Sequence, residues 1–248
     1  MLITPKNKKV YFQDWGFIPY AEAWQKQKNL VEKIVQIKLA NRKTRSVQEI
    51  LATPNYLIFC EHPPVYTLGK NGKIAHLLIT EKECQEKKIE FFPIDRGGDI
   101  TFHGPGQIVG YPILDLENFF TDLHLYLRKL EQAIISLLQE YNLEAGRIAG
   151  LTGVWLGINN NPRKIAAIGI RCSRWVTMHG FALNINTDLS FFNHIIPCGI
   201  SDKAVTSLAK ELGYNVPLEE VKPKLIAALS QEFEWEYEVE TTQTEREG

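Results

Sequence analysis

The chain has 248 residues, of which 44% are hydrophobic and 23% charged, as is usual for a soluble globular protein. Its 28 basic and 29 acidic residues give a formal net charge of −1, and the basic residues are scattered, which argues against a nucleic acid partner. No apolar run approaches the roughly 20 residues of a membrane span, and the first residues lack the apolar core of a secretion signal. We therefore expect a cytoplasmic protein that contacts no membrane.

The first half of the chain alternates short apolar runs with polar breaks. Apolar residues recur near helical spacing from Tyr20 to Ile34, directly after Pro19, which predicts a helix. The polar segment 41–48 follows as a loop or helix end. Apolar runs bounded by proline, glycine or charged residues predict strands at 9–12, 56–60, 65–69 and 91–94, with a short helix at 80–88.

The second half contains the clearest amphipathic helix, because leucine and isoleucine recur every three or four residues from Leu123 to Tyr141. A β-rich run at 107–116 precedes it. The runs 153–158 and 164–171 are joined by an asparagine-rich loop and predict a hairpin, with which 176–186 pairs. A last helix is predicted at 221–229.

This order of elements predicts an α+β fold with a mixed or largely antiparallel sheet flanked by helices. The sequence shows no repeat and no low-complexity linker, so we expect one domain over residues 1–240. Residues 241–248 are polar and predict a frayed tail.

The stretch RGGDITFHGPGQ, from Arg96 to Gln107, predicts a binding loop between two strand-like runs. Glycine lets a backbone adopt conformations closed to other residues and approach a ligand closely. Arg96 and His103 supply hydrogen-bond donors beside these glycines. Arg96 and Asp99 either brace the loop as a charge pair or contact a ligand directly.

The four cysteines, Cys60, Cys84, Cys172 and Cys198, are far apart and form no C-x-x-C pair, so neither structural zinc nor a redox dithiol is indicated. The default role of such a cysteine is a small buried apolar residue. Cys198 is the exception, because it stands in a P-C-G turn that would hold a thiol on a rigid, uncrowded loop. A catalytic thiol needs a nearby base or positive charge.

Three residues are candidate acid/base groups. His103 is the best placed histidine and His179 the second, although either side chain can instead fix a loop through hydrogen bonds. Lys164 opens the apolar run 165–170 and can act as acid or base there, or be a strand-end lysine that reaches solvent. The other histidines have no spacing typical of metal ligands, so we predict no metal site.

Small residues on the two strands after Lys164 suggest a groove. Ala167 and Gly169 share one face of the first strand, and Gly180 and Ala182 share a face of the next. Such a groove suits a narrow linear apolar group such as an acyl chain. Close packing of the two strands explains the same glycines without any ligand.

Taken together, these motifs closely resemble those of the octanoyltransferases of lipoate biosynthesis, also called lipoyl(octanoyl) transferases. In chain order they are R-G-G-x-x-T-F-H-G-P-G-Q, G-V-W, K-I-A-A-I-G-I, H-G-F-A-L-N and P-C-G-I. The match runs from about Glu61 to Leu208, which is more than half of the chain. The resemblance implies a fold similar to the catalytic domains of biotin and lipoate protein ligases.

The resemblance also implies transfer of an octanoyl group from the phosphopantetheine thioester of acyl carrier protein to a lysine of a lipoyl domain, the first step of endogenous protein lipoylation. Cys198 would be the acyl-accepting nucleophile and Lys164 its acid/base partner, without ATP and without a resident cofactor. The implied substrate-binding residues are Arg96, Gly97, Gly98, Asp99, Ile100, Thr101, Phe102, His103, Ala167, Ile168, Gly169, Gly180, Phe181 and Ala182.

The implied acceptors are the lipoyl domains of 2-oxoacid dehydrogenase complexes and the glycine cleavage H protein, and we expect a monomer. Two other functions stay open. An ATP-dependent lipoate or biotin ligase of the same fold would adenylate a free acid and need no cysteine nucleophile. A non-catalytic module would only dock acyl carrier or lipoyl domains.

Overall fold

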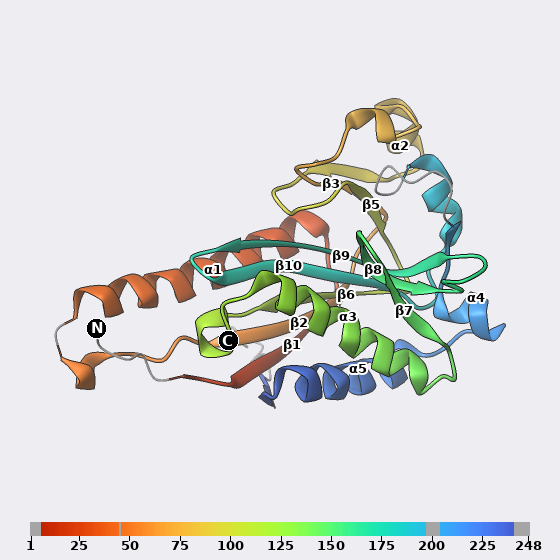
Figure 1. Ribbon diagram of the computed structural model, residues 1–248. Helices are drawn as coiled ribbons and strands as arrows, with labels where there is room; N and C mark the ends of the chain where they lie inside the picture. Colours follow the sequence, from red (N-terminus) through yellow and green to blue (C-terminus); the bar gives the residue numbers. More distant parts are fainter. Residues whose placement is uncertain (1–5, 45, 197–203, 241–248) are drawn as a thin grey trace, which may run out of the picture.

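A computed structural model describes residues 6–44, 46–196 and 204–240 (Figure 1). Within these residues a large sheet has nine strands. They are β1 (Lys9–Phe17), β2 (Asn55–Glu61), β6 (Gln107–Ile113), β7 (Ala145–Ile148), β8 (Leu151–Leu156), β9 (Arg163–Ser173), β10 (Val176–Asn184), β11 (Ala204–Val205) and β12 (Glu236–Val239).

The large sheet is mixed, as predicted. Eight strands follow the order β12-β1-β2-β6-β10-β9-β8-β7, and β11 pairs with β9 beside this path. β1 is parallel to both of its neighbours, and β11 is parallel to β9. All pairs from β2 to β7 are antiparallel. The predicted hairpin of β8 and β9 and its pairing with β10 are therefore confirmed.

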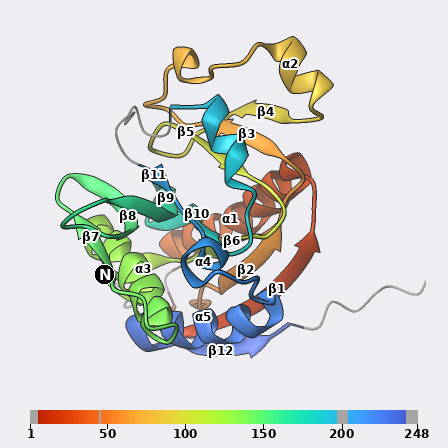
Figure 2. The same ribbon diagram turned by 90° about the vertical axis from the view of Figure 1, so that its right-hand side faces the viewer.

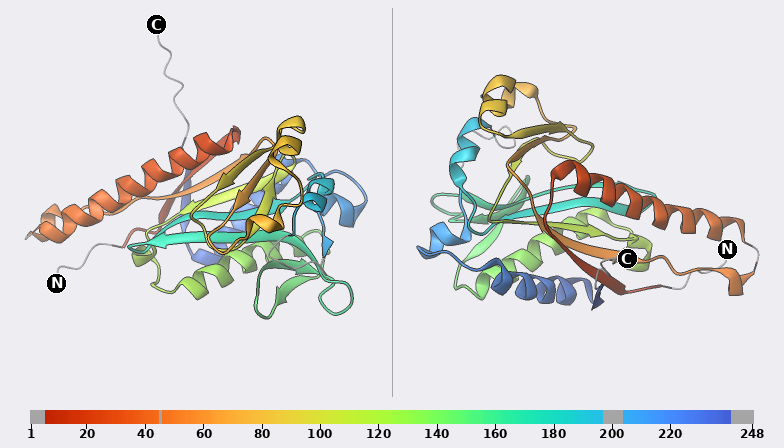
Figure 3. Two further views of the ribbon diagram at one scale, coloured as in Figure 1. Left: turned by 90° about the horizontal axis from the view of Figure 1, so that it is seen from above. Right: turned by 180° about the vertical axis from the view of Figure 1, so that it is seen from behind.

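Helices cover both faces of this sheet (Figure 3). Helix α1 (Tyr20–Lys43) packs on one face, and α3 (Leu123–Gln139) and α5 (Leu218–Phe233) pack on the other. Alternate residues of β2 serve the two faces, since Tyr56 and Ile58 belong to the core under α1 while Leu57 and Phe59 belong to the core under α3 and α5. A strand buried on both sides is continuously apolar, which is why the apolar run 56–60 was enough to predict β2 from the sequence.

A second sheet of three strands stands above one end of the large sheet (Figure 2). Its order is β4 (Glu90–Pro93), β3 (Val65–Leu68) and β5 (Ile100–His103). Helix α2 (Glu81–Glu86) covers it and begins at a capping box formed by Thr80 and Glu83. The four residues of β5 fall inside the stretch predicted as a loop, so that part of the prediction was wrong.

The predicted strands and helices are otherwise confirmed, although their ends differ, most of all at α1, which continues beyond Ile34 to Lys43. The sequence prediction missed β5, β7, β11, β12 and the short helix α4 (Leu208–Leu212). The α+β fold is confirmed, while the single-domain span 1–240 stays a prediction and the predicted tail 241–248 lies outside the described residues. No helix in the described part of the chain combines the length and apolar character needed to span a bilayer.

Candidate functional site

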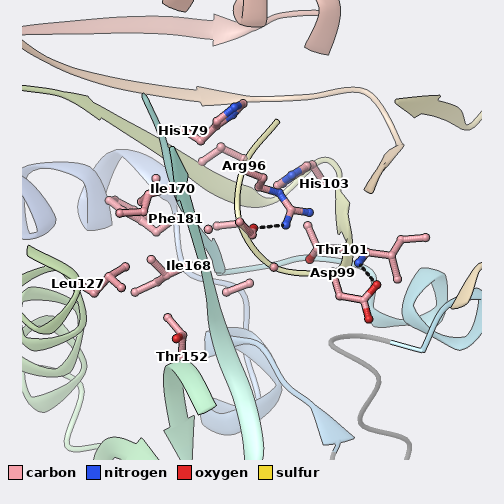
Figure 4. A pocket seen from close by; sticks show the side chains of 18 of the residues that line it. Arg96, Asp99, Thr101, His103, Leu127, Thr152, Ile168, Ile170, His179 and Phe181 are labelled. Atoms are coloured by element: carbon pink, nitrogen blue, oxygen red, sulfur yellow. Dashed lines mark hydrogen bonds between the residues drawn. The ribbon is translucent and has the colours of Figure 1, made fainter. Parts of the chain in front are cut away.

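A cavity of about 500 Å³ lies where the loop 95–99 and β5 approach β9 and β10 (Figure 4). Its volume is within the usual range for small-molecule sites. Lys164 and all but one of the fourteen predicted substrate-binding residues line it. The exception is Phe102, whose buried ring stacks on Phe191 in the core of the small sheet, with ring centroids 4.6 Å apart.

Backbone hydrogen bonds hold the loop 95–99, which contains Gly97 and Gly98, against both sheets. The N–H of Gly97 donates to the carbonyl of Ile170 on β9 at 2.9 Å, and the N–H of Asn71, after β3, donates to the carbonyl of Gly98 at 3.1 Å. Gly98 has a φ of +88°, a conformation that other residues rarely adopt. The loop thus forms a fixed wall of the cavity.

Arg96 and Asp99 both brace this loop, each through its own partners. The Arg96 guanidinium donates to the carbonyl and the hydroxyl of Thr67, at 2.8 and 3.0 Å. The Asp99 carboxylate accepts from the N–H of Ile100 at 2.7 Å and is bound by His76 Nδ1 at 2.5 Å. The predicted alternative was bracing as a charge pair of Arg96 with Asp99, and these contacts with Thr67 and His76 were not predicted.

His103 has the geometry of a histidine that fixes a loop. Its Nδ1 lies 2.9 Å from Gln107 Oε1 and its Nε2 lies 3.3 Å from the Thr67 hydroxyl, so both ring nitrogens have protein partners. The ring stacks on Tyr20, with centroids 5.9 Å apart. Burial, assisted by neighbouring His62 and Arg96, holds the pKa of His103 well below its usual value. The side chain is therefore neutral near pH 7.

His179 ties β10 to Asp95, the first residue of the loop 95–99. Its Nε2 donates to Asp95 Oδ1 at 2.9 Å, and its backbone N–H donates to Gln27 Oε1 at 3.0 Å. Burial lowers the pKa of His179, and the hydrogen bond from His179 lowers the pKa of Asp95. His179 has a φ of +60°, which is unfavourable for a residue with a side chain and is often found at functional sites.

Lys164 lies near the beginning of β9 and is only 8% exposed. Its Nζ is 4.7 Å from the centre of the Trp155 ring on β8. Its backbone carbonyl accepts from the N–H of Thr206 at 2.9 Å, and Val205 of β11 is its partner in the sheet. A strand-end lysine that reaches solvent does not fit this burial.

The small residues on β9 and β10 face each other as the alternation predicted. Gly169 pairs with Gly180 and Ala167 pairs with Ala182, and all four line the cavity. A Cβ at Gly169 would lie 2.9 Å from Arg96 Cδ, and one at Gly180 would lie 2.2 Å from the carbonyl oxygen of Gly110. Close packing against the loop 95–99 and against β6 therefore accounts for these two glycines, whereas the alternative left open was close packing of the two strands with each other.

Two comparisons identify the family. The model of the lipoyl protein ligase A/B catalytic domain matches residues 19–230. The octanoyltransferase of Flavobacterium johnsoniae is 57% identical over 233 residues, covering 93% of this chain and 99% of that protein. The octanoyltransferase of Cytophaga hutchinsonii is 53% identical over 240 residues, covering 96% and 98%. The chain belongs to the octanoyltransferase family.

Lipoate ligases have a fold similar to that of this octanoyltransferase family member. A bipartite lipoate protein ligase from Thermoplasma acidophilum, analysed together with its E2 lipoyl domain, has a TM-score of 0.65. The comparison covers 95% of this chain and 86% of the ligase chain at 15% sequence identity. At that identity the likeness shows the fold alone, and it confirms the predicted similarity to lipoate ligases.

Part of the cavity wall was not among the predicted substrate-binding residues, although Ile170 and His179 stand within the quoted motifs. It comprises Tyr20, Asn71, Val109, Tyr111, Leu127, Gly150, Leu151, Thr152, Ile170 and His179. His179 is one of the candidate bases, and Leu127 belongs to the apolar stripe that predicts α3, so the sequence offers a signal for these two. Tyr20 and Tyr111 come from separate predicted elements, and no local pattern joins them to the motifs.

Cys198, the predicted nucleophile of this octanoyltransferase family member, lies outside the described residues. The described chain on either side of it is joined to a residue in the cavity wall or next to it. The N–H of Ile196 donates to the carbonyl of His76 at 2.8 Å, and His76 binds Asp99. On the other side, Val205 pairs with Lys164. Across the described residues, no three His, Cys, Asp or Glu side chains gather as metal ligands would.

Proposed function

We propose that the protein transfers an octanoyl group from octanoyl-acyl carrier protein to a lysine of lipoyl domains, through a thioester on Cys198. The observation that carries this proposal is the buried Lys164 in the wall of a cavity that also has an apolar part, in a chain of the octanoyltransferase family. The apolar wall includes Leu127, Ile168 and Phe181 (Figure 4). These side chains suit the hydrocarbon part of an acyl group.

In the first half-reaction, the Cys198 thiol gives its proton to the Lys164 amine, and the thiolate attacks the thioester carbonyl. The carbon–sulfur bond to phosphopantetheine breaks, and Lys164 returns the proton to the leaving thiol. One thioester replaces another, so the step needs no ATP. Support comes from the chain on both sides of residues 197–203, which pairs with Lys164 of the cavity wall on one side and bonds on the other to His76, the partner of the cavity-lining Asp99.

In the second half-reaction, the acceptor lysine amine attacks the acyl-enzyme carbonyl. Lys164 takes a proton from the attacking amine, the bond to Cys198 breaks as the amide forms, and Lys164 returns the proton to the Cys198 sulfur, which restores the free thiol. The amide is more stable than the thioester, which makes this half-reaction downhill. The thirteen predicted binding residues that line the cavity, together with Phe102 behind them, would hold the acyl group and its thioester.

We further propose that the protein needs no resident cofactor and works as a monomer in the cytoplasm. Its acceptors would be the lipoyl domains of 2-oxoacid dehydrogenase complexes and the glycine cleavage H protein. The fold likeness to a lipoate ligase analysed with its E2 lipoyl domain supports an acceptor of this kind.

Intact-mass measurement after incubation with octanoyl-acyl carrier protein, without ATP, tests the proposal. We expect an octanoyl mass increment that is absent in Cys198→Ser. Cys172→Ser is the matched control, because Cys172 lies near the far end of β9 and does not line the cavity, and it should keep the increment. Lys164→Ala should slow single-turnover acylation without unfolding the protein.

Two outcomes would overturn the proposal. If no adduct forms but octanoate plus ATP modifies a lipoyl domain, the protein is a ligase. If it binds acyl carrier or lipoyl domains without either product, it is a docking module. An unchanged acylation rate in Lys164→Ala would remove Lys164 from the mechanism.

A further inference from the structure

Trp155 lies directly beside the amine of Lys164. The two residues are partners in the antiparallel pairing of β8 with β9, which puts their side chains on the same face of the sheet. The Trp155 ring is 1% exposed, and its centre lies 4.7 Å from Lys164 Nζ. This distance is within the range of attraction between a cation and an aromatic ring face.

No hydrogen bond within the described residues accounts for the position of this indole. Its Nε1 is buried and has no acceptor there. A buried N–H without an acceptor is destabilising, so an apolar side chain of similar size would be the less costly way to fill the same space. The contact that distinguishes an indole from an apolar side chain at this position is its ring face toward Lys164.

The strand that carries Trp155 is shaped to receive the lysine side chain. Gly153 has a φ of +124°, and a Cβ there would lie 2.6 Å from the Ala166 carbonyl oxygen and 3.4 Å from Lys164 Cε. The missing side chain therefore leaves room for the end of the lysine stem. Glycine is the residue that tolerates both the conformation and this close approach.

A buried carboxylate fixes Gly153 in turn. Glu131 on α3 is fully buried and accepts from the N–H of Gly153 at 3.0 Å. Arg147 and Arg128 bind the other oxygen of the same carboxylate at 2.9 and 2.8 Å. The beginning of β8, and with it the Trp155 ring, is thereby anchored to the helix that also supplies Leu127 to the cavity.

We propose that Trp155 is a positioning residue, which holds the Lys164 amine over its ring face for proton transfer. The inference rests on the proposed function of Lys164 as the proton acceptor. The ring face attracts an ammonium more strongly than a neutral amine, because the interaction is electrostatic. When Lys164 takes the thiol proton, the new ammonium is stabilised where it forms. The ring takes part in no bond exchange.

Two substitutions separate the ring face from simple space filling. Trp155→Phe keeps an aromatic face, whereas Trp155→Leu keeps only an apolar side chain. We expect Trp155→Leu to lower the maximal single-turnover rate of enzyme acylation roughly 5- to 30-fold, with the apparent KM for octanoyl-acyl carrier protein unchanged. Trp155→Phe should retain the rate within about threefold.

Trp235→Leu is the matched control, because it makes the same change in a buried tryptophan that packs on Phe233 in the core under α3 and α5. It should lower stability while leaving the acylation rate as it was. Equal acylation rates in Trp155→Leu and the unaltered protein would overturn the inference, as would equal losses in the Leu and Phe variants.

A second measurement does not depend on transferase activity. In protein with ¹³C-labelled lysine, the ε-methylene signal of Lys164 should be shifted upfield by the indole ring and is assigned by its loss in Lys164→Arg. The upfield shift should disappear in Trp155→Leu, persist in part in Trp155→Phe and stay in Trp235→Leu. An unshifted signal in the unaltered protein refutes the positioning role, whereas absent acylation with a shifted signal refutes only the proposed function.

Discussion

Two neutral histidines, His62 and His103, are buried side by side, with ring centroids 6.0 Å apart, and His103 lines the cavity. His62 Nδ1 donates to the carbonyl of Ile18 at 2.7 Å, and its Nε2 accepts from the Tyr111 hydroxyl at 2.7 Å. Burial lowers the pKa of His62 to about 4, even though the hydrogen bond to Ile18 opposes this shift. These histidines hold loops together in their uncharged form.

This burial predicts that the protein loses stability as the pH falls. Between pH 6.5 and 4 the unfolded chain binds a proton at His62 and the folded chain does not, so the free energy of unfolding decreases as the pH falls through this range. From pH 7 to pH 5, His62 alone should contribute a loss of about 2 kcal/mol. Urea unfolding of His62→Gln at both pH values should show a pH difference smaller by that amount.

His124→Gln is the control, because His124 is exposed on α3 and its replacement should leave the pH difference unchanged. The prediction concerns the difference between the two pH values, so a general loss of stability in His62→Gln does not affect it. The same pH difference in His62→Gln and the unaltered protein would show that another group is responsible.

At the residue scale, the sequence indicated side chains around the cavity but not their partners. Arg96 and His103 stood out because they lie among glycines, a combination that folding alone rarely requires. Their common partner, Thr67, lies on β3 about thirty residues earlier, and Tyr20 stacks on His103 from α1. Only the tertiary structure brings these residues together, so no spacing in the sequence could show it.

At the element scale, burial decided which strands and helices could be predicted. α3 was found because one side of it is buried against α5 and the sheet, which imposes an apolar stripe. β12 was missed because all four of its residues are exposed. β12 is a strand through its parallel pairing with β1, which begins more than 220 residues earlier, and such a strand leaves no apolar pattern.

One buried ion pair fastens the C-terminal part of α1 to the turn after β6. Lys38 Nζ binds the Asp115 carboxylate, and the two residues are 6% and 3% exposed. The Thr53 hydroxyl also donates to Asp115, at 2.8 Å. Lys38→Met removes the cation and leaves a carboxylate buried, so we expect the free energy of unfolding at pH 7 to fall by about 3 to 5 kcal/mol in urea.

Lys82→Met provides the comparison, because Lys82 makes an exposed pair with Glu86 on α2. Exposed pairs contribute little, so this change should stay within about 0.5 kcal/mol. A loss below about 1 kcal/mol in Lys38→Met would mean that the Thr53 hydroxyl and water satisfy the Asp115 carboxylate without the cation.

At the scale of the whole molecule, the cavity exists because two sheets meet. The sequence predicted most strands of both sheets, but it gave no sign that 65–68, 90–93 and 100–103 form a separate sheet. That division depends on which strands pair, and pairing over long separations is not encoded in local periodicity. The contact between the sheets at the cavity consists largely of backbone atoms. The Gly97 N–H donates to the Ile170 carbonyl, and the Arg96 side chain lies against Gly169.

Gly169→Ala should therefore push the small sheet away from the large one. Its new Cβ would lie 2.9 Å from Arg96 Cδ and 3.0 Å from the Gly97 carbonyl oxygen, so the loop must move. We expect a loss of about 1 to 3 kcal/mol in urea unfolding. We also expect a several-fold higher apparent KM for octanoyl-acyl carrier protein, because the displaced loop is a wall of the cavity. Gly146→Ala on β7 is the matched control, because Gly146 lies outside the contact between the two sheets.

A Cβ at Gly146 would meet only Ile158 Cδ1, at 2.7 Å, and that methyl group ends a flexible side chain that is 37% exposed. Gly146→Ala should cost less than about 1 kcal/mol and leave the KM as it is. If Gly169→Ala lowered stability but not substrate affinity, the contact between the sheets would serve folding alone. If it changed neither, the loop would have room to shift, and the glycine would not be required for the two sheets to meet.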